Sequence, residues 1–292
     1  MKKNRLWNRL FTALMFLFLY APIFVLIIFS FNATKSRTVW GGFSLQWYVR
    51  LFQDKAILSA LRTTLLVSVL SALIAVVAGT AASIGFSAMK RRSRTVLMAI
   101  NNVPLTNADI VTGVSLSLLF VLAFTLFNAV QGWLNAALGT SLSFRWEKGF
   151  GTLLIAHVTF NIPYVILSVM PRIRQLDPHV YEAAQDLGAT GWYAFRKVIL
   201  PDLTPGIING GLIAFTMSVD DFVISYFTAG TRVSTLAMEV YSMARRKISP
   251  EINAISTLLF VSVLLLLAVV NLRQSRQESA LRRKKAALSP GK

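Results

Sequence analysis

Long apolar blocks alternate with polar or basic segments along this chain. Each block holds about 20 residues or more, the length that crosses a bilayer as an α-helix. The pattern predicts six transmembrane helices, at residues 10–31, 60–89, 110–127, 151–170, 203–228 and 252–272. The first block follows a basic start but is longer than a cleavable signal sequence, so we interpret it as a retained anchor. Six helices place both termini on one side of the membrane.

One apolar stretch, residues 96–128, is too long for a single straight span. The sequence NNVPLTNAD at residues 101–109 interrupts it with a proline and three asparagines. Irregular backbone at membrane depth is tolerated only against protein or a water-filled cavity. We therefore expect a discontinuity before the third span, and external loops at residues 32–59, 129–148 and 229–250.

Composition agrees with an all-α integral membrane protein, because 55% of the 292 residues are hydrophobic and only 14% are charged. We expect one transmembrane domain over residues 1–292, with its core at 10–272 and a basic tail at 273–292. The absence of cysteine excludes disulfides and thiol catalysis. The two histidines, His157 and His179, lie far apart without a ligand cluster, so no metal site is expected. His157 is expected to form an interhelical hydrogen bond rather than to carry a proton.

The formal charge of +18 could indicate nucleic-acid binding, but the positions of the basic residues favour a topological role. Cytoplasmic segments of membrane proteins are enriched in Lys and Arg. Most of the basic residues gather in alternate inter-span segments: Lys2, Lys3, Arg5 and Arg9; Lys90, Arg91, Arg92 and Arg94; Arg172, Arg174, Arg196 and Lys197; and the tail from Arg273. We expect a multi-pass protein of the bacterial inner membrane, with cytoplasmic termini and no nucleic-acid partner.

The cytoplasmic segment between the fourth and fifth spans carries helix-capping signals. Asp177 and Pro178 favour a helix start, and Gly188 suits a left-handed residue at its end. Thr190 can cap a second short helix over residues 191–199, which Pro201 is expected to end. The segment is predicted to form two short helices with a bend between them, a form suited to contact with a soluble partner.

This segment resembles the EAA loop of ABC-importer permeases, whose pattern is EAA, three residues, G, nine residues and I-x-L-P. The matching residues are Glu182, Ala183, Ala184, Gly188, Val198, Leu200 and Pro201, with Val198 in place of the usual isoleucine. The resemblance implies a type I importer permease fold of six helices, with coupling helices that sit in a groove of a cytoplasmic ATPase dimer. No phosphate-binding GxxxxGK[ST] run occurs in the chain. ATP and Mg²⁺ are therefore expected to serve a separate ATPase subunit, and this chain is expected to be neither an enzyme nor a cofactor-binding protein.

Acidic residues at membrane depth cost about 2.5–3.5 kcal/mol each on insertion scales and are therefore functional candidates. Asp109 begins the third span, and Asp220 and Asp221 lie towards the outer end of the fifth. Because successive helical residues point about 100° apart, one of the pair could face a pathway while the other caps a helix break or pairs with Arg232. Phe222 and Tyr226 add aromatic rings that suit a cationic amine.

Several further segments resemble spermidine/putrescine permeases, in particular the second of the two non-identical permeases in such importers. They are YAPIFVLIIFSFN (residues 20–32), AHVTFNIPYV (156–165), AFTMSVDDFVISYF (214–227) and YSMARRKISPEINAIST (241–257). The resemblance implies a second permease subunit and an extracytoplasmic polyamine-binding protein as partners. Arg245, Arg246 and Lys247, on an expected external loop, either dock an acidic patch of that protein or are solvated.

Other functions stay open from the sequence. An ABC permease for another solute, such as ferric ion or an opine-like compound, would share the EAA loop. An ion-coupled secondary carrier or channel is the alternative from another class, although it has no need of a capped cytoplasmic loop and is expected to show inverted repeats.

Overall fold

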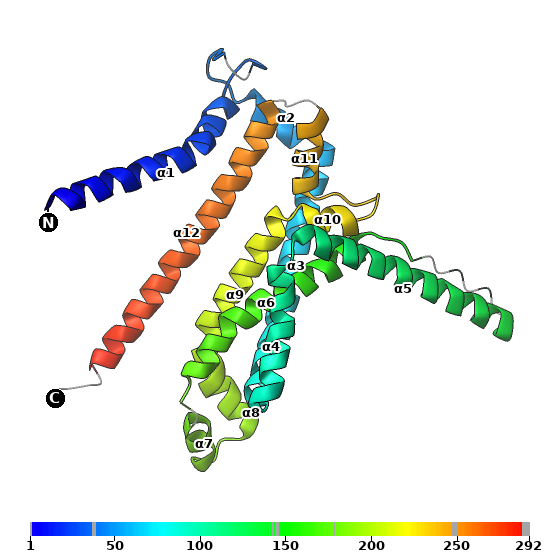
Figure 1. The fold of residues 1–292 in the computed structure, drawn as a ribbon, viewed down its shortest axis with the longest axis vertical. Coiled ribbons are helices and arrows are strands. Elements are labelled where there is room, and N and C mark those ends of the chain that lie inside the picture. Colours follow the sequence, from blue (N-terminus) through cyan, green and yellow to red (C-terminus); the bar gives the residue numbers. More distant parts are fainter. Residues whose placement is uncertain are drawn as a thin grey trace. The chain divides into compact units, whose positions relative to one another are not determined.

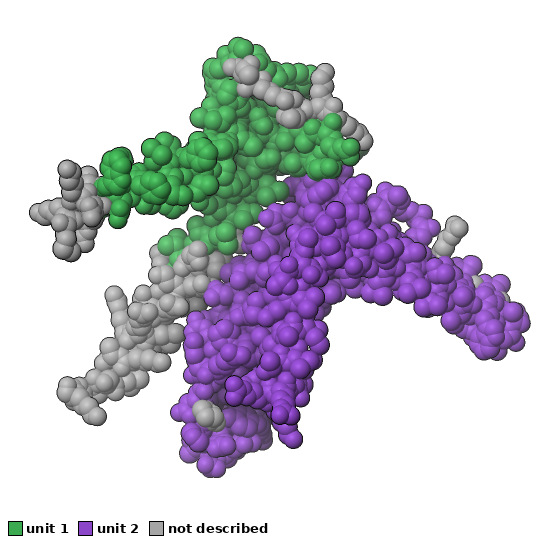
Figure 2. Space-filling view, viewed as in Figure 1, with its two compact units in different colours: residues 1–58, 240–292 green, residues 59–239 purple. Residues whose placement is uncertain are grey.

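The computed structural model describes residues 2–36, 39–139, 141, 143, 146–177, 179–246 and 250–287, and within these ranges every regular element is a helix (Figure 1). An isolated bridge between Asn32 and Phe43 adds the one extended pairing in the described residues. The predicted all-α class is therefore confirmed. The chain divides into two compact units, residues 1–58 with 240–292 and residues 59–239, which Figure 2 colours separately.

The first unit contains α1 (Lys2–Ser30), α2 (Gln46–Gln53) and α12 (Pro250–Ala287), and α12 packs against both of the others. Buried Asn32 organises the turn after α1, since its side chain accepts a hydrogen bond from the Gly41 N–H (2.8 Å) and donates to the Val39 carbonyl (2.9 Å). The indole N–H of Trp47 donates to the Asn32 carbonyl at 2.6 Å. Trp47 is therefore a core residue that is 2% exposed.

The second unit is built around α6 (Phe150–Gln175) and α9 (Leu200–Asp220), which pack together along their lengths. Because lipid gives no hydrophobic drive for helix association, close packing of small residues supplies much of it. Ala72, Ala75 and Gly79 of α3 (Lys55–Ala88) lie against α6 in this way, and a Cβ atom added at Gly79 would come within 2.8 Å of Val165. The other elements are α4 (Arg91–Thr106), α5 (Asp109–Leu138), α7 (His179–Asp186), α8 (Gly191–Ala194), the π-helical turn η1 (Phe195–Ile199) and α10 (Val223–Thr228), with α11 (Leu236–Arg246) continuing into the first unit.

Several predicted boundaries needed correction. The expected discontinuity before the third span exists at Asn107 and Ala108, between α4 and α5, although Pro104 itself lies within α4. The third span does not end at residue 127, because α5 continues to Leu138 and occupies much of the expected external loop. The other two expected loops contain the helices α2 and α11. Both were interpreted as loops because they carry polar residues and are too short to span the membrane.

The fifth predicted span is not one helix. α9 ends at Asp220, and the short helix α10 follows at Val223. Five helices in the described chain are long and apolar enough to span a membrane: Trp7–Ser30, Lys55–Ala88, Asp109–Leu138, Phe150–Gln175 and Gly191–Asp220. The sixth predicted span falls in α12, whose apolar stretch is the shorter Pro250–Leu265.

The packing of α9 on α6 predicts that Gly206→Ala destabilises the protein. A Cβ atom at Gly206 would lie 2.9 Å from the carbonyl oxygen of Ser168 and 2.9 Å from Cγ of Arg172. The matched control is Gly85→Ala on α3, because a Cβ atom there meets nothing within 4 Å. Both changes gain the same helix propensity, so the difference between them measures the steric clash, which should lower the free energy of unfolding by about 1–3 kcal/mol. Thermal unfolding of the purified protein in detergent checks this, and equal midpoints for the two variants would contradict it.

Candidate functional site

The segment between α6 and α9 folds from its own capping signals. The Asp177 carboxylate accepts a hydrogen bond from the His179 N–H at 3.0 Å and so opens α7. At the other end of α7, Gly188 has a φ of 86°, the Ala189 N–H donates to the Ala184 carbonyl, and the Gly188 N–H donates to the Gln185 carbonyl. These two bonds form a Schellman motif, which needs a left-handed residue at the glycine position. The predicted glycine bend is confirmed; Pro178 lies outside the described residues.

The second short helix begins as predicted but does not end at Pro201. Thr190 caps α8 by accepting a hydrogen bond from the Tyr193 N–H at 3.4 Å. The helix then passes through the π turn η1 directly into α9, and Leu200 keeps helical dihedrals. Pro201 has no N–H, and its ring would crowd the carbonyl of residue 197 in a regular helix. The wider π turn, in which the Leu200 N–H reaches the Phe195 carbonyl, lets the helix continue past the proline.

The surface of this segment combines an acidic group with exposed apolar side chains. The Glu182 side chain is 72% exposed on α7, beside His179 at 3.5 Å. Leu187 is 90% exposed and Trp192 is 71% exposed. A hollow of about 460 Å³ opens between the two short helices, lined by Ala184, Leu187, Gly188, Ala189, Thr190, Tyr193 and Val198. Four residues of the EAA-type pattern therefore lie on this surface or line its hollow: Glu182, Ala184, Gly188 and Val198.

The second cluster of candidate residues surrounds the break between α9 and α10. Asp220 is the last residue of α9 and is exposed. Asp221 leaves the helical conformation, with φ −65° and ψ 120°, and its side chain is 7% exposed. Its carboxylate accepts hydrogen bonds from the N–H groups of Ile224 (3.2 Å) and Ser225 (2.7 Å), and from the Ser225 hydroxyl (2.9 Å). Asp221 thus caps α10, while Asp220 is the exposed member of the pair.

The other candidates lie around this break in different ways. The rings of Phe222 and Tyr226 lie 5.5 Å apart, and Tyr226 is 54% exposed. Asp109 begins α5 and is exposed, and α5 packs on α10 where Gly113 lets Phe227 approach. Of the two alternatives for the second aspartate, the cap of a helix break is the one found; the guanidinium of Arg232 lies 3.4 Å from the Glu147 carboxylate instead.

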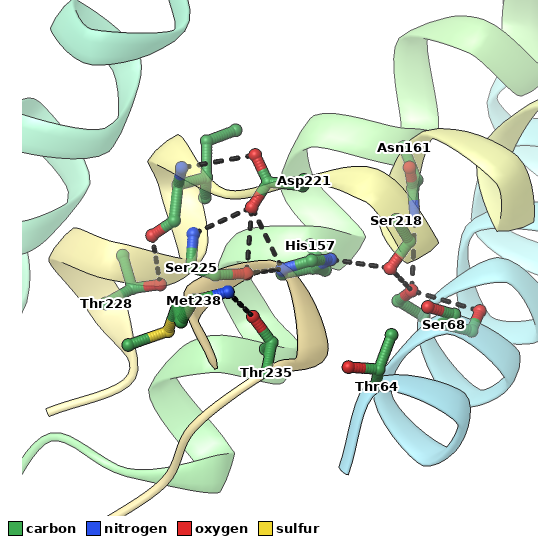
Figure 3. Close-up of polar contacts among 12 residues, drawn as sticks. Thr64, Ser68, His157, Asn161, Ser218, Asp221, Ser225, Thr228, Thr235 and Met238 are labelled. Atoms are coloured by element: carbon green, nitrogen blue, oxygen red, sulfur yellow. Dashed lines mark hydrogen bonds and ion pairs between the residues drawn. The ribbon is translucent and has the colours of Figure 1, made fainter. Parts of the chain in front are cut away.

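A buried polar network joins four helices at this break (Figure 3). His157 of α6 is 1% exposed, and its Nδ1 lies 2.6 Å from the Ser218 hydroxyl of α9, while its Nε2 lies 3.0 Å from the Ser225 hydroxyl of α10. The Ser218 hydroxyl lies 3.3 Å from that of Ser71 on α3, which in turn accepts a hydrogen bond from the Asn161 amide at 3.1 Å. The expectation that His157 is an interhelical hydrogen-bond partner is confirmed.

Sequence reasoning missed the serines and the asparagine of this network. Their one signal was the presence of small polar residues inside apolar blocks, which can form hydrogen bonds between helices in lipid. Of the cationic cluster expected to be external, Arg245 lies over the Tyr241 ring at 5.9 Å, whereas the Arg246 side chain and Lys247 lie outside the part of the chain that the structure describes. Within the described chain, no group of three or more His, Asp or Glu side chains is placed to hold a metal ion.

Comparison with known proteins adds a family and a fold. The family model described as "Binding-protein-dependent transport system inner membrane component" matches residues 75–283. The putrescine transport system permease protein PotI of Escherichia coli is 39% identical over 258 residues, which cover 88% of this chain and 86% of that protein. The spermidine/putrescine transport system permease protein PotC of the same species is 33% identical over 88% of this chain and 90% of that protein.

Solved structures with the same fold are also transporters. A crystal structure of a bacterial ABC transporter involved in the import of the acidic polysaccharide alginate aligns with a TM-score of 0.67, at 18% identity over 94% of this chain and 96% of the other. The bacterial alginate ABC transporter in complex with an alginate pentasaccharide-bound periplasmic protein aligns with a TM-score of 0.62, at 17% identity over 93% and 92%. At these identities the likeness is evidence of the fold alone.

Proposed function

Because this chain belongs to the family of binding-protein-dependent transport system inner membrane components, we propose that it is the permease subunit of an ATP-driven importer of polyamines. The observation that carries the proposal is the match, over 86–90% of their lengths, to permeases of putrescine and spermidine/putrescine transport systems. The protein is a multi-pass component of the inner membrane and acts in transport rather than catalysis. Its proposed orientation places both termini in the cytoplasm.

The break between α9 and α10 supports a cationic substrate. The C-terminal end of a helix carries a partial negative charge, and membrane transporters use such ends at discontinuous helices to bind cations. Here α9 ends in an exposed carboxylate, Asp220, and the aromatic rings of Phe222 and Tyr226 follow within two turns. A polyamine carries several ammonium groups, each of which can pair with a carboxylate and lie over an aromatic face. Asp220 is therefore the proposed pathway carboxylate, and Asp109 is proposed as a second one. Asp221 has a structural role, because it caps α10.

The α7–η1 segment supports coupling to a separate ATPase. It presents Glu182, the exposed Leu187 and a hollow beside them, and it continues without a gap into the helix that ends at Asp220. In the proposed assembly an ATPase dimer, using ATP and Mg²⁺, contacts this segment. A second permease subunit completes the pathway, and an extracytoplasmic binding protein delivers the polyamine.

Glu182→Lys should abolish coupled transport while leaving the protein in the membrane. The change reverses the charge of a side chain that is 72% exposed, so it alters the docking surface without disturbing the packing of α7. In proteoliposomes containing the complete importer, putrescine uptake and the ATP hydrolysis stimulated by the loaded binding protein should both fall more than about tenfold, because like charges across an interface cost several kcal/mol. Glu182→Gln removes the charge at constant size and should lose less. Normal uptake by the lysine variant would refute the coupling role.

Asp220→Asn should have a different signature. Removing the pathway carboxylate should lower putrescine uptake about tenfold at a saturating concentration of loaded binding protein, by loss of one ammonium–carboxylate contact. The stimulated ATP hydrolysis should persist, because the α7–η1 segment is unchanged. Asp220→Glu keeps the charge and serves as the control. Unaltered uptake by Asp220→Asn would remove this residue from the substrate path.

A further inference from the structure

We propose that His157 is a positioning residue that joins α9 to α10 across the helix break and so holds the Asp220–Tyr226 region in its transport-competent geometry. The inference rests on the proposed function for its transport readout, but its structural basis is independent of the substrate. His157 touches neither Asp220 nor Tyr226 through any described contact, so its effect on them is indirect.

The break itself leaves α9 and α10 with few direct backbone links. In a continuous helix the N–H groups of Ile224 and Ser225 would donate to carbonyls four residues earlier. Here both donate to the Asp221 carboxylate instead. The orientation of α10 relative to α9 therefore depends on the extended residue Asp221 and on contacts from neighbouring helices.

His157 makes such a contact on both sides of the break. It projects from α6 and reaches Ser218, three residues before Asp221, with one ring nitrogen, and Ser225, four residues after it, with the other. The ring is buried, and Figure 3 shows it lying between the two hydroxyls. A side chain with one polar atom could satisfy one hydroxyl only, whereas the imidazole ring spans both at 2.6 and 3.0 Å.

The direction of one bond follows from the hydrogens available. A carboxylate can only accept, so the Ser225 hydroxyl donates its single hydrogen to Asp221 at 2.9 Å. The Ser225 oxygen is then left as an acceptor, and the hydrogen between it and His157 must come from Nε2. The imidazole of His157 therefore orients the Ser225 hydroxyl, which in turn donates to the capping carboxylate of Asp221. Loss of the Nε2–H donor weakens the capping of α10 as well as its tie to α6.

The hydrogen-bond network around His157 also includes α3. Asn161 lies one turn after His157 on α6 and donates to the Ser71 hydroxyl, which lies 3.3 Å from Ser218. The two polar residues of α6 thus fix α3, α9 and α10 to one site. A rearrangement of α10 during transport has to break these contacts or carry them along.

Three substitutions of His157 separate positioning from space filling. The amide nitrogen of Gln reaches the place of Nε2, so His157→Gln keeps a donor for Ser225. The shorter Asn places its amide near Nδ1, so His157→Asn keeps the contact with Ser218 and loses the one with Ser225. His157→Leu fills the space without polar atoms. Because the Ser225 contact supports the cap of α10, we expect Gln to retain more of the putrescine uptake than Asn. Asn and Leu should reduce it about fivefold, the effect of one lost hydrogen bond.

A double-mutant cycle with Ser225→Ala tests the specific contact. Ser225→Ala removes both the contact with His157 and the hydroxyl's bond to Asp221. It should therefore reduce uptake at least about fivefold in the wild-type background, and by a smaller factor in His157→Asn, where only the bond to Asp221 remains to be lost. Thr159→Ala, two residues away on the exposed side of α6, is the control and should transport normally, since its hydroxyl bonds only within its own helix among the described contacts. Full additivity of Ser225→Ala and His157→Asn, or equal uptake by the Asn and Gln variants, would overturn the inference.

Hydrogen exchange supplies a readout that does not depend on the substrate. Amides of residues 223–229 in His157→Asn should exchange about fivefold faster than in His157→Gln, because α10 opens more readily once its tie is lost. Equal exchange in the two variants would also contradict the positioning role. If instead the wild-type importer moves no putrescine or spermidine, the proposed function fails while the exchange result still decides the inference.

Discussion

The membrane allows no backbone N–H group to remain without a partner, and this constraint determines the form of the candidate site. Each unsatisfied group in hydrocarbon costs several kcal/mol, so a spanning helix can be interrupted only where side chains replace the missing carbonyls. Asp221 does this at the α9–α10 break by accepting two backbone N–H groups and a hydroxyl. Once Asp221 is used in this way, Asp220 is left exposed at the end of α9, and Phe222 and Tyr226 are brought together on the next turn.

α6 is the helix of the second unit that contacts α3, α9 and α10. Its Val165 and Val169 pack against the small residues of α3 and α9, and its His157 and Asn161 reach the serines of those helices and of α10. The apolar contacts set how closely the helices approach, because glycine and alanine leave room for neighbouring backbone. The polar contacts set their register, because a hydrogen bond fixes one atom against another. The same helix, α6, thus supplies both the close apolar contacts and the hydrogen bonds that align α3, α9 and α10.

Local signals in the sequence predicted much of this structure. The caps at Asp177, Gly188 and Thr190 could be predicted because each depends on residues only a few positions apart. The break after Asp220 was considered only as one alternative for the aspartate pair, because residues 203–228 were interpreted as one span. Asp221 supplies the local cap, but the support from His157 comes from another helix. The serines that meet His157 lie 61 and 68 residues from it in sequence, so only the fold brings them together.

Pro201 was interpreted as a stop signal, yet the chain remains helical from Gly191 to Asp220. At 1.5 Å per residue, these 30 residues form a rod about 45 Å long. Had the proline ended the helix, the chain would bend there, and a movement of residues 191–199 would not carry over to α9. With the π turn in place, a tilt of about 5° at one end displaces the other by about 4 Å over that length. The extra residue in one turn of the helix therefore keeps residues 191–220 continuous, and in the proposed coupling role it would let α9 move with the docking segment as one body.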